Sequence, residues 1–234
     1  MSRPLQRMFT EVPPRYDLIN TVITWGLDRR WRKKAAEECL SGKPKQMLDL
    51  CCGTGDLALT VCRLGRGGIR VVGIDYSPPM LELARKKALS LGDDRYISFT
   101  HGDVASLLFP EASFDCAGIS FAFRNLTYRN PVARRHLTEV RRVLTDGGRY
   151  VIVETSQPNS RFIRRLFHWY LSWFVYRVGF WLSGNRGAYN YLAESAAGFY
   201  TAGEVEDMLL EAGFREVLYR PFMFGVVGIH VAVK

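Results

Sequence analysis

Short apolar runs alternate with amphipathic segments along most of the chain. The apolar runs have the length of strands and end at glycine or polar residues, whereas the segments between them carry apolar residues three and four positions apart. This pattern predicts strands near 47–50, 71–75, 96–100, 114–120 and 149–154, and helices near 56–64, 77–91 and 131–144. Strands that alternate with helices indicate a parallel, doubly wound α/β sheet.

The end of the chain departs from this alternation. A helix is predicted at 203–212, followed by strands at 215–222 and 225–233 that are joined tightly at Met223 and Phe224. Such a short connection requires the two strands to be antiparallel. We therefore expect a Rossmann-like, seven-stranded sheet that is mostly parallel and has an antiparallel last strand. This argues against the NAD-binding fold, in which the sixth strand continues parallel.

A glycine turn follows the first strand, in the stretch Asp49-Leu50-Cys51-Cys52-Gly53-Thr54-Gly55-Asp56. Glycines permit positive φ and leave no Cβ between the backbone and a ligand. The helix that is predicted to begin near Asp56 presents unpaired N–H groups at its start. Such a turn suits a nucleotide-like molecule that lies across the end of a strand.

Two cofactors use this arrangement. Gly53, Gly55 and Ala58 match the dinucleotide fingerprint, but Asp56 would place a carboxylate where a pyrophosphate has to lie. S-adenosylmethionine (SAM) carries an ammonium and a sulfonium and no phosphate, and Asp49 supplies a second carboxylate. The form D-L-x-x-G-T-G-D, which includes Thr54, also resembles motif I of class I SAM-dependent methyltransferases. SAM is therefore favoured over NAD and over an ordinary strand–helix turn.

Further cofactor contacts are expected at the ends of the next strands. Asp75 ends the second strand and can accept hydrogen bonds from the ribose hydroxyls that NAD and SAM share, and Tyr76 could pack near the adenine. The resemblance to methyltransferases implies that Asp103 meets the adenine amino group and that the backbone at Val104 meets a ring nitrogen; a turn or N-cap is the alternative for Asp103. Ser120 ends the fourth strand and is expected to face the cofactor.

The topological switch point is expected to hold the methyl acceptor. The carboxyl ends of the first and fourth parallel strands flank this point. Arg124 and Asn125 form a polar pair among aromatic residues immediately after the fourth strand. We expect the substrate to meet the methyl group there.

Composition limits the partners. The 234 residues carry a formal net charge of +9, which favours an anionic partner such as nucleic acid, a membrane surface or an acidic substrate, although excess charge often only aids solubility. The five cysteines form no C-x-x-C pair and the four histidines lie far apart, so neither a disulfide framework nor a metal site is expected. The lack of an apolar leader and this use of cysteine suit the cytoplasm.

Two segments lie outside the predicted strand–helix alternation. Residues 1–45 are basic and aromatic, and they are either a solvated helical cap or a lid over the cofactor pocket. Residues 161–197 form an apolar insertion in which Arg165, His168 and Arg177 interrupt the run that a bilayer span needs. The insertion could be a buried helix or homodimer interface, a peripheral membrane contact at the inner face of the cell membrane, or a pocket for a long apolar tail.

Several segments together resemble one family, the menaquinone/ubiquinone biosynthesis C-methyltransferases, over nearly the whole chain. The segments are Y-D-L-I-N at 16–20, D-L-C-C-G-T-G-D at 49–56, I-S-F-A-F-R-N at 119–125, E-T-S-Q-P at 154–158 and Y-N-Y-L-A-E-S at 189–195. The resemblance implies a single domain over 1–234 that methylates a ring carbon of a prenylated quinol, as in demethylmenaquinol to menaquinol. Thr155, Gln157 and Ala122-Phe123 depart from the family's usual residues, so the naphthoquinol and benzoquinol substrates both stay open.

Catalysis by such an enzyme requires loss of a hydroxyl proton from the quinol, so that the adjacent carbon becomes a nucleophile. The candidate groups are Arg124 with Asn125, Tyr189, Tyr191 and Asp17. His168 could also be the base, although a lone histidine in an aromatic helix is more often packed and satisfied. An arginine stays protonated, so Arg124 suits stabilisation of the quinolate. An RNA methyltransferase and a binding protein that has lost activity are the alternatives. No RRM or KH signature accompanies the basic residues, so nucleic acid is not the expected partner.

Overall fold

A computed structural model describes residues 16–183 and 186–234. Seven strands form one sheet in the order β3-β2-β1-β4-β5-β7-β6. They are β1 (Gln46–Leu50), β2 (Arg70–Asp75), β3 (Ile97–His101), β4 (Phe114–Ser120), β5 (Leu144–Thr155), β6 (Glu216–Phe222) and β7 (Val227–Val233). The first five are parallel, and β7 runs antiparallel to both β5 and β6. The predicted fold class, including the antiparallel last strand, is confirmed.

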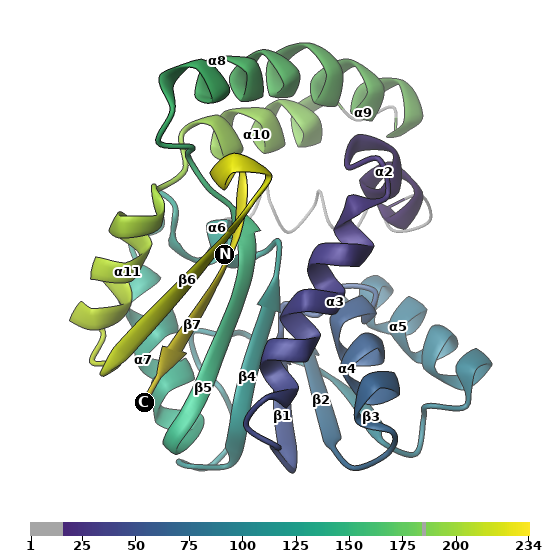
Figure 1. Cartoon of the computed structure of the whole chain (residues 1–234). Coiled ribbons are helices and arrows are strands. Elements are labelled where there is room, and N and C mark those ends of the chain that lie inside the picture. The colour runs from purple at the N-terminus through teal and green to yellow at the C-terminus, as the bar shows by residue number, and fades with distance from the viewer. Residues whose placement is uncertain (1–15, 184–185) are drawn as a thin grey trace.

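One face of the sheet is covered by α3 (Leu27–Leu40), α4 (Asp56–Gly65) and α5 (Pro78–Leu91) (Figure 1). Their apolar stripes are buried against the strands, with Trp31 and Ala35 of α3 and Leu57 and Val61 of α4 in one core cluster. α4 returns the chain from β1 to β2 and α5 from β2 to β3, whereas α3 precedes the first strand. The predicted helix periodicity therefore reflects burial on the sheet.

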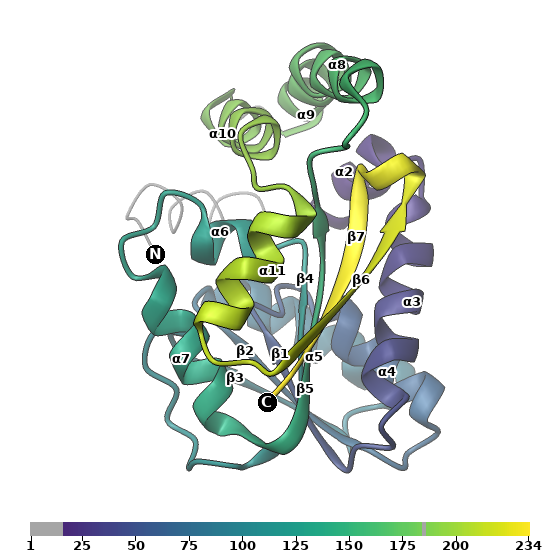
Figure 2. The ribbon, with the colours of Figure 1, turned by 60° about the vertical axis from the view of Figure 1, so that its left-hand side comes forward.

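The opposite face is covered by α6 (Phe123–Thr127), α7 (Ala133–Val143) and α11 (Ala202–Glu211) (Figure 2). Leu137 and Val140 of α7 and Leu209 of α11 belong to the second core cluster. The short helix α6 was not predicted, because five residues are too few for apolar periodicity to show. It carries Arg124 and Asn125 beyond the end of β4.

The insertion forms a helical layer beyond the carboxyl ends of the parallel strands (Figures 1 and 2). It consists of α8 (Arg161–Tyr170), the π-helical turn η2 (Leu171–Val175), α9 (Tyr176–Ser183) and α10 (Arg186–Ala197). Its buried side packs against α2 (Tyr16–Ile23) in a third apolar cluster that joins Ile19 and Ile23 to Phe167 and Leu171. Segments distant in sequence thus enclose the space above the sheet. None of the described helices is both long and apolar enough to cross a bilayer.

One strand begins earlier than predicted, and the predicted tight link between the last two strands takes a defined form. β5 begins at Leu144, earlier than the predicted start at 149, and its pairing with β4 shifts register between Phe114 and Cys116. Gly147 there has a φ of 75° and donates its N–H to the carbonyl of Lys234. The tight link between β6 and β7 is a single 3₁₀ turn, η3 (Met223–Gly225). A register shift has no hydrophobic period, so the sequence could not place it, whereas the tight link was predicted at Met223 and Phe224.

Candidate functional site

A cavity of about 470 Å³ lies above the carboxyl ends of β1, β2 and β4, between these strands and the layer of α2 and α8. One end is polar and is lined by the glycine turn and by four aspartates: Asp28, Asp49, Asp56 and Asp75. The other end is apolar and is lined by Ile163, Leu166, Phe167, Tyr170, Leu171 and Val175. Arg124 and Asn125 also line the cavity, after the end of β4. Cofactor and acceptor candidates therefore share one chamber.

The glycine turn has the backbone that the sequence predicted. Gly53 and Gly55 adopt φ values of 54° and 81°. A Cβ at Gly55 would lie 2.9 Å from the Phe99 ring, whereas a Cβ at Gly53 would meet no atom within 4 Å. Gly55 is therefore needed for packing, and Gly53 leaves open space beside the cavity.

Asp49 lies beneath this turn at the end of β1 and is 1% exposed. Its Oδ2 accepts the Ala58 N–H at 3.0 Å, and its Oδ1 has no partner among the described residues. Burial raises the pKa of Asp49 to about 8, although the Ala58 N–H and the charge of Arg32 both oppose this rise. A buried carboxylate with a free oxygen is suited to a cationic ligand.

Asp75 joins the turn to the end of β2. Its Oδ2 accepts the Gly53 N–H at 2.9 Å and its Oδ1 accepts the Ser77 N–H at 2.8 Å. Burial raises the pKa of Asp75, and these backbone donors oppose the rise. The neighbouring Tyr76 lines the cavity, and its ring lies 5.5 Å from that of His101. The buried Ser120 Oγ has no partner among the described residues and also lines the cavity.

Not every predicted cofactor residue reaches the cavity. The cavity is lined by seven of them: Asp49, Gly53, Thr54, Asp56, Asp75, Tyr76 and Ser120. It is not lined by Gly55, Ala58, Asp103 and Val104. Ala58 acts through its N–H on Asp49, and Val104 is buried in a core cluster. Asp103 accepts the Ala105 N–H at 2.9 Å, which is the turn geometry that was its alternative interpretation. The adenine roles of Asp103 and Val104 stay predictions.

Arg124 is held by an acidic residue from the neighbouring strand. Its side chain is 4% exposed, and its Nη1 donates to Glu154 Oε1 at 3.0 Å and to Thr155 Oγ1 at 2.9 Å. Glu154 Oε2 also accepts the backbone N–H of Arg124 at 3.1 Å. Arg124 Nε is buried without a partner among the described residues. A guanidinium that Glu154 and Thr155 hold in place thus belongs to the cavity wall.

The remaining catalytic candidates lie at different places. Tyr191 is half-buried on α10, and burial raises the pKa of its hydroxyl while the charge of Arg124 lowers it. The side chain of Tyr189 is outside the described residues. Asp17 accepts a hydrogen bond from the Thr54 hydroxyl at 2.7 Å and does not line the cavity. His168 lies 2.8 Å from Gln157 Oε1 and is also outside the lining.

Sequence reasoning missed several residues around the cavity. Arg32 and Asp28 of α3 and Thr155 of β5 all line it. Lys87 of α5 contacts the Thr54 hydroxyl at 2.9 Å and Asp56 at 2.7 Å. The only sequence signal for Arg32 was a run of basic residues, which does not reveal the side that points inward.

The donor set fits SAM. No group of three or more metal-ligating side chains occurs in the described part of the chain. The free oxygen of Asp49, the acid at the end of β2 and the space beside Gly53 form an acidic site without a phosphate cradle. Asp49 and Asp75 would hold the cationic end and the ribose, respectively.

Comparison with known proteins agrees with this chemistry. Residues 2–234 match the model of the ubiE/COQ5 methyltransferase family. The demethylmenaquinone methyltransferase of Deinococcus radiodurans is 40% identical over 98% of this chain and 92% of its own. The ubiquinone/menaquinone biosynthesis C-methyltransferase UbiE of Geobacter sulfurreducens is 33% identical over 98% of this chain and 88% of its own. A SAM-dependent methyltransferase from Aquifex aeolicus, at 18% identity, superposes with a TM-score of 0.57 over 81% of each chain.

Proposed function

The chain belongs to the ubiE/COQ5 methyltransferase family and is a SAM-dependent methyltransferase, and from this premise we propose that it methylates a ring carbon of a prenylated quinol. The acceptor that we favour is demethylmenaquinol, which would become menaquinol. A benzoquinol precursor of ubiquinone is the second candidate, because relatives that are named for both pathways match the chain.

The shape and polarity of the single chamber carry this proposal. Its acidic end suits a cofactor with an ammonium and a sulfonium, and its apolar end suits the start of a prenyl tail. Arg124 lies where the acceptor ring would separate the two ends. A polar acceptor such as a nucleic acid would not be stabilised by the apolar wall of α8 and η2.

Arg124 is proposed to stabilise the deprotonated hydroxyl of the quinol. SAM supplies the methyl group as an electrophile. The ring carbon beside a quinolate oxygen is electron-rich, so a cation at that oxygen favours the deprotonated form. Glu154 and Thr155 occupy Nη1, so another N–H group of the Arg124 guanidinium would donate to this oxygen. Held by Glu154, the guanidinium need not reorganise during the reaction.

Asn125, Tyr189 and Tyr191 are proposed to orient the ring. Asn125 lines the cavity next to Arg124, and an amide can both donate to and accept from the two quinol oxygens. Tyr191 lies close enough to Arg124 for the guanidinium to lower its pKa. Because burial is the larger effect and raises this pKa, Tyr191 is suited to donate a hydrogen bond at neutral pH.

The reaction is tested by supplying purified protein with labelled SAM and reduced demethylmenaquinone or a reduced ubiquinone precursor in detergent. Label is expected in the naphthoquinol, on a ring carbon by mass spectrometry. Arg124→Ala should lower turnover far more than SAM affinity. If SAM binds while neither lipid is labelled, the quinol proposal fails; label in added RNA would assign the enzyme to the other class.

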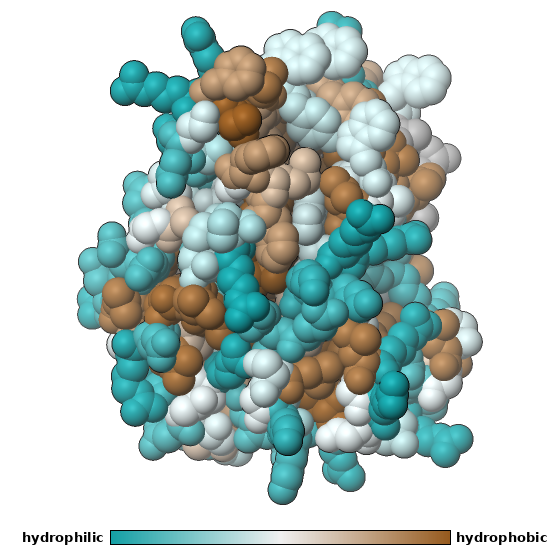
Figure 3. All heavy atoms as spheres, viewed as in Figure 1, coloured by the Kyte–Doolittle hydropathy of each residue, from teal (hydrophilic) through white to brown (hydrophobic). Residues whose placement is uncertain are grey.

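A membrane contact is proposed at the mouth of the cavity. Trp25, Leu166, Met223 and Phe224 both line the cavity and are exposed, and Phe224 is 85% exposed. Apolar and aromatic side chains gather at this end of the molecule (Figure 3). A quinol that is delivered from a bilayer would enter through this mouth with its tail still in lipid.

The charge of the same surface favours anionic lipids. Exposed tryptophans at 169, 173 and 181 lie in the same segment as Arg161, Arg165 and Arg177, and the stretch 161–183 contains no acidic residue. Aromatic rings at lipid headgroup level with arginines beside them are typical of an interfacial helix. The surface therefore suits the anionic face of a membrane.

Co-sedimentation with vesicles tests this contact. The protein should pellet with vesicles that contain phosphatidylglycerol and much less with neutral ones. A Trp169→Ser, Trp181→Ser variant should lose this binding yet still methylate a short-tailed quinol. Leu108→Ser is the control, because Leu108 is 91% exposed and lies away from this surface. The carbonyls of its neighbours Leu107 and Phe109 accept hydrogen bonds from Arg142, near the end of α7. If the double variant instead dissociates a homodimer and leaves vesicle binding unchanged, the surface is a dimer interface and the membrane proposal fails.

A further inference from the structure

The lining of the polar end of the cavity holds more acidic than basic side chains. Four aspartates line it, at positions 28, 49, 56 and 75, whereas the cationic residues of the described lining are Arg32 and Arg124. Arg124 is already paired with Glu154. Arg32 is therefore the one cation of this described lining that is available beside the glycine turn.

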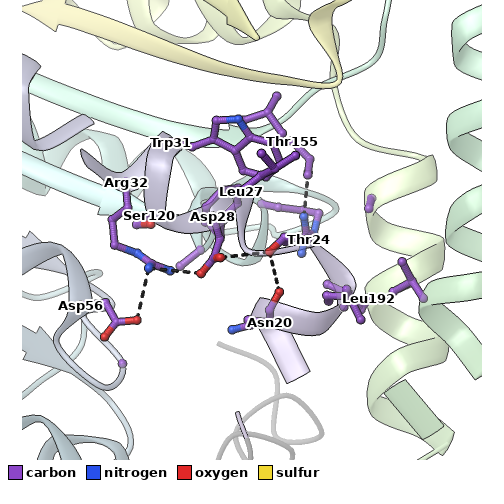
Figure 4. A pocket seen from close by; sticks show the side chains of 18 of the residues that line it. Asn20, Thr24, Leu27, Asp28, Trp31, Arg32, Asp56, Ser120, Thr155 and Leu192 are labelled. Carbon is purple, nitrogen blue, oxygen red and sulfur yellow. Dashed lines mark hydrogen bonds and ion pairs between the residues drawn. The ribbon is translucent and has the colours of Figure 1, made fainter. Parts of the chain in front are cut away.

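Arg32 reaches the turn from α3. Its Nη1 lies 3.3 Å from Asp28 Oδ2 and 3.3 Å from Asp56 Oδ2, and its side chain is 11% exposed (Figure 4). These distances are longer than the roughly 2.7–2.9 Å of a strong charged hydrogen bond. Both contacts also use a single nitrogen of a group that carries several N–H donors. The guanidinium is thus held in the cavity wall with donors left for a ligand.

The methionine end of SAM carries a carboxylate as well as two positive centres. The aspartates suit the positive centres, but they would repel that carboxylate if no cation stood between them. A guanidinium matches a carboxylate in shape and can donate two parallel hydrogen bonds to it. We infer that Arg32 binds the methionine carboxylate of SAM, which displaces Asp28 or Asp56 as its partner.

This assignment makes α3 part of the cofactor site. Asp28 is itself fixed by the Thr24 hydroxyl at 3.0 Å, so the charges of Arg32 and Asp28 are positioned together on one segment (Figure 4). Under this assignment α3 does more than cover the cavity, because it binds the methionine end of the cofactor. The inference rests on SAM as the cofactor and is independent of which quinol accepts the methyl group.

The test compares two ligands that differ by the carboxylate alone. Calorimetry measures the affinity of S-adenosylhomocysteine and of its decarboxylated analogue for the wild-type protein, Arg32→Met and Arg32→Lys. Arg32→Met should weaken S-adenosylhomocysteine by about 10- to 100-fold, the range for one charged hydrogen-bonded contact. The affinity of the decarboxylated analogue should change less than about twofold, because that ligand has no group for Arg32 to bind. Arg32→Lys should restore part of the loss.

The same data separate binding from folding. Arg29→Met removes an exposed arginine from the same helix and should leave both affinities unchanged. An equal loss of affinity for both ligands in Arg32→Met and Arg32→Lys would mean that Arg32 has a structural role alone, and it would overturn the inference. Wild-type affinity of Arg32→Met for S-adenosylhomocysteine would overturn it as well. No quinol is present, so the outcome is independent of the proposed methyl acceptor.

Discussion

The buried pair of Arg124 and Glu154 offers the sharpest test of how the site is built. The change is Glu154→Gln, which keeps the shape of the side chain and removes its charge. Glu154 is 3% exposed and accepts hydrogen bonds from Arg124 Nη1, the Arg124 N–H, the Thr155 N–H and the Thr155 hydroxyl. The amide leaves the guanidinium buried without its counter-charge.

The size of the effect follows from that burial. Removing one partner of a buried ion pair costs about 3–5 kcal/mol, because the remaining charge keeps its desolvation penalty. For a domain of this length, about 1 kcal/mol corresponds to roughly 2–4 °C in Tm. We therefore expect Glu154→Gln to lower the Tm by about 6–20 °C. Turnover should fall as well, because Arg124 is no longer held in place.

Urea unfolding followed by circular dichroism measures the free energy of unfolding. The matched control is Glu37→Gln, since Glu37 pairs with Lys34 at 2.8 Å where both side chains are well exposed. That control should change stability by less than about 0.5–1 kcal/mol. A double variant, Arg124→Met with Glu154→Met, should lose much less than the sum of the single losses. A loss in Glu154→Gln no larger than in the control, or additive losses, would refute the reasoning.

Four further predictions concern cofactor binding and the ionisable groups around it. Burial raises the pKa of Asp49 to about 8, and a cationic ligand favours its ionised form. SAM binding should therefore release close to one proton at neutral pH, and the affinity for SAM should increase with pH up to about pH 8. Calorimetry in buffers of different ionisation enthalpy measures both effects. A carboxyl group whose pKa is higher in the folded than in the unfolded state lowers stability as the pH rises from about 4 to about 8. Asp49→Asn should therefore raise the Tm at pH 8 while it weakens SAM binding. An unchanged Tm would contradict the cost of ionising Asp49 in the folded protein. Asp75→Ala should weaken SAM by about 10-fold or more with little effect on turnover of the bound complex, as equilibrium binding and single-turnover rates would show. Lys87→Met should speed release of S-adenosylhomocysteine in stopped flow, with the affinity changed only several-fold, because Lys87 ties the half-exposed Asp17 of α2 to Asp56 beside the turn.

Local patterns in the sequence determined the fold and one half of the site. Strands that are buried on both faces read as apolar runs, and the short link at Met223–Gly225 forced β7 to be antiparallel. The glycine turn, Asp49 and Asp75 were found because one strand–turn–helix–strand unit, from β1 to β2, places them within a short stretch of chain. Their contacts depend on backbone geometry that nearby residues fix.

The other half of the site was decided by tertiary contacts between distant segments. The sequence marked Arg124 but could not pair it with Glu154, which lies thirty positions away on the adjacent strand. Arg32 could not be told from the exposed Arg29 and Arg30, because only the docking of α3 onto α4 fixes which side of that helix faces the cavity. The hydrophobic period gives the buried side of a helix but not the ligand that a charged residue at its margin can reach, and that depends on how separate elements pack together.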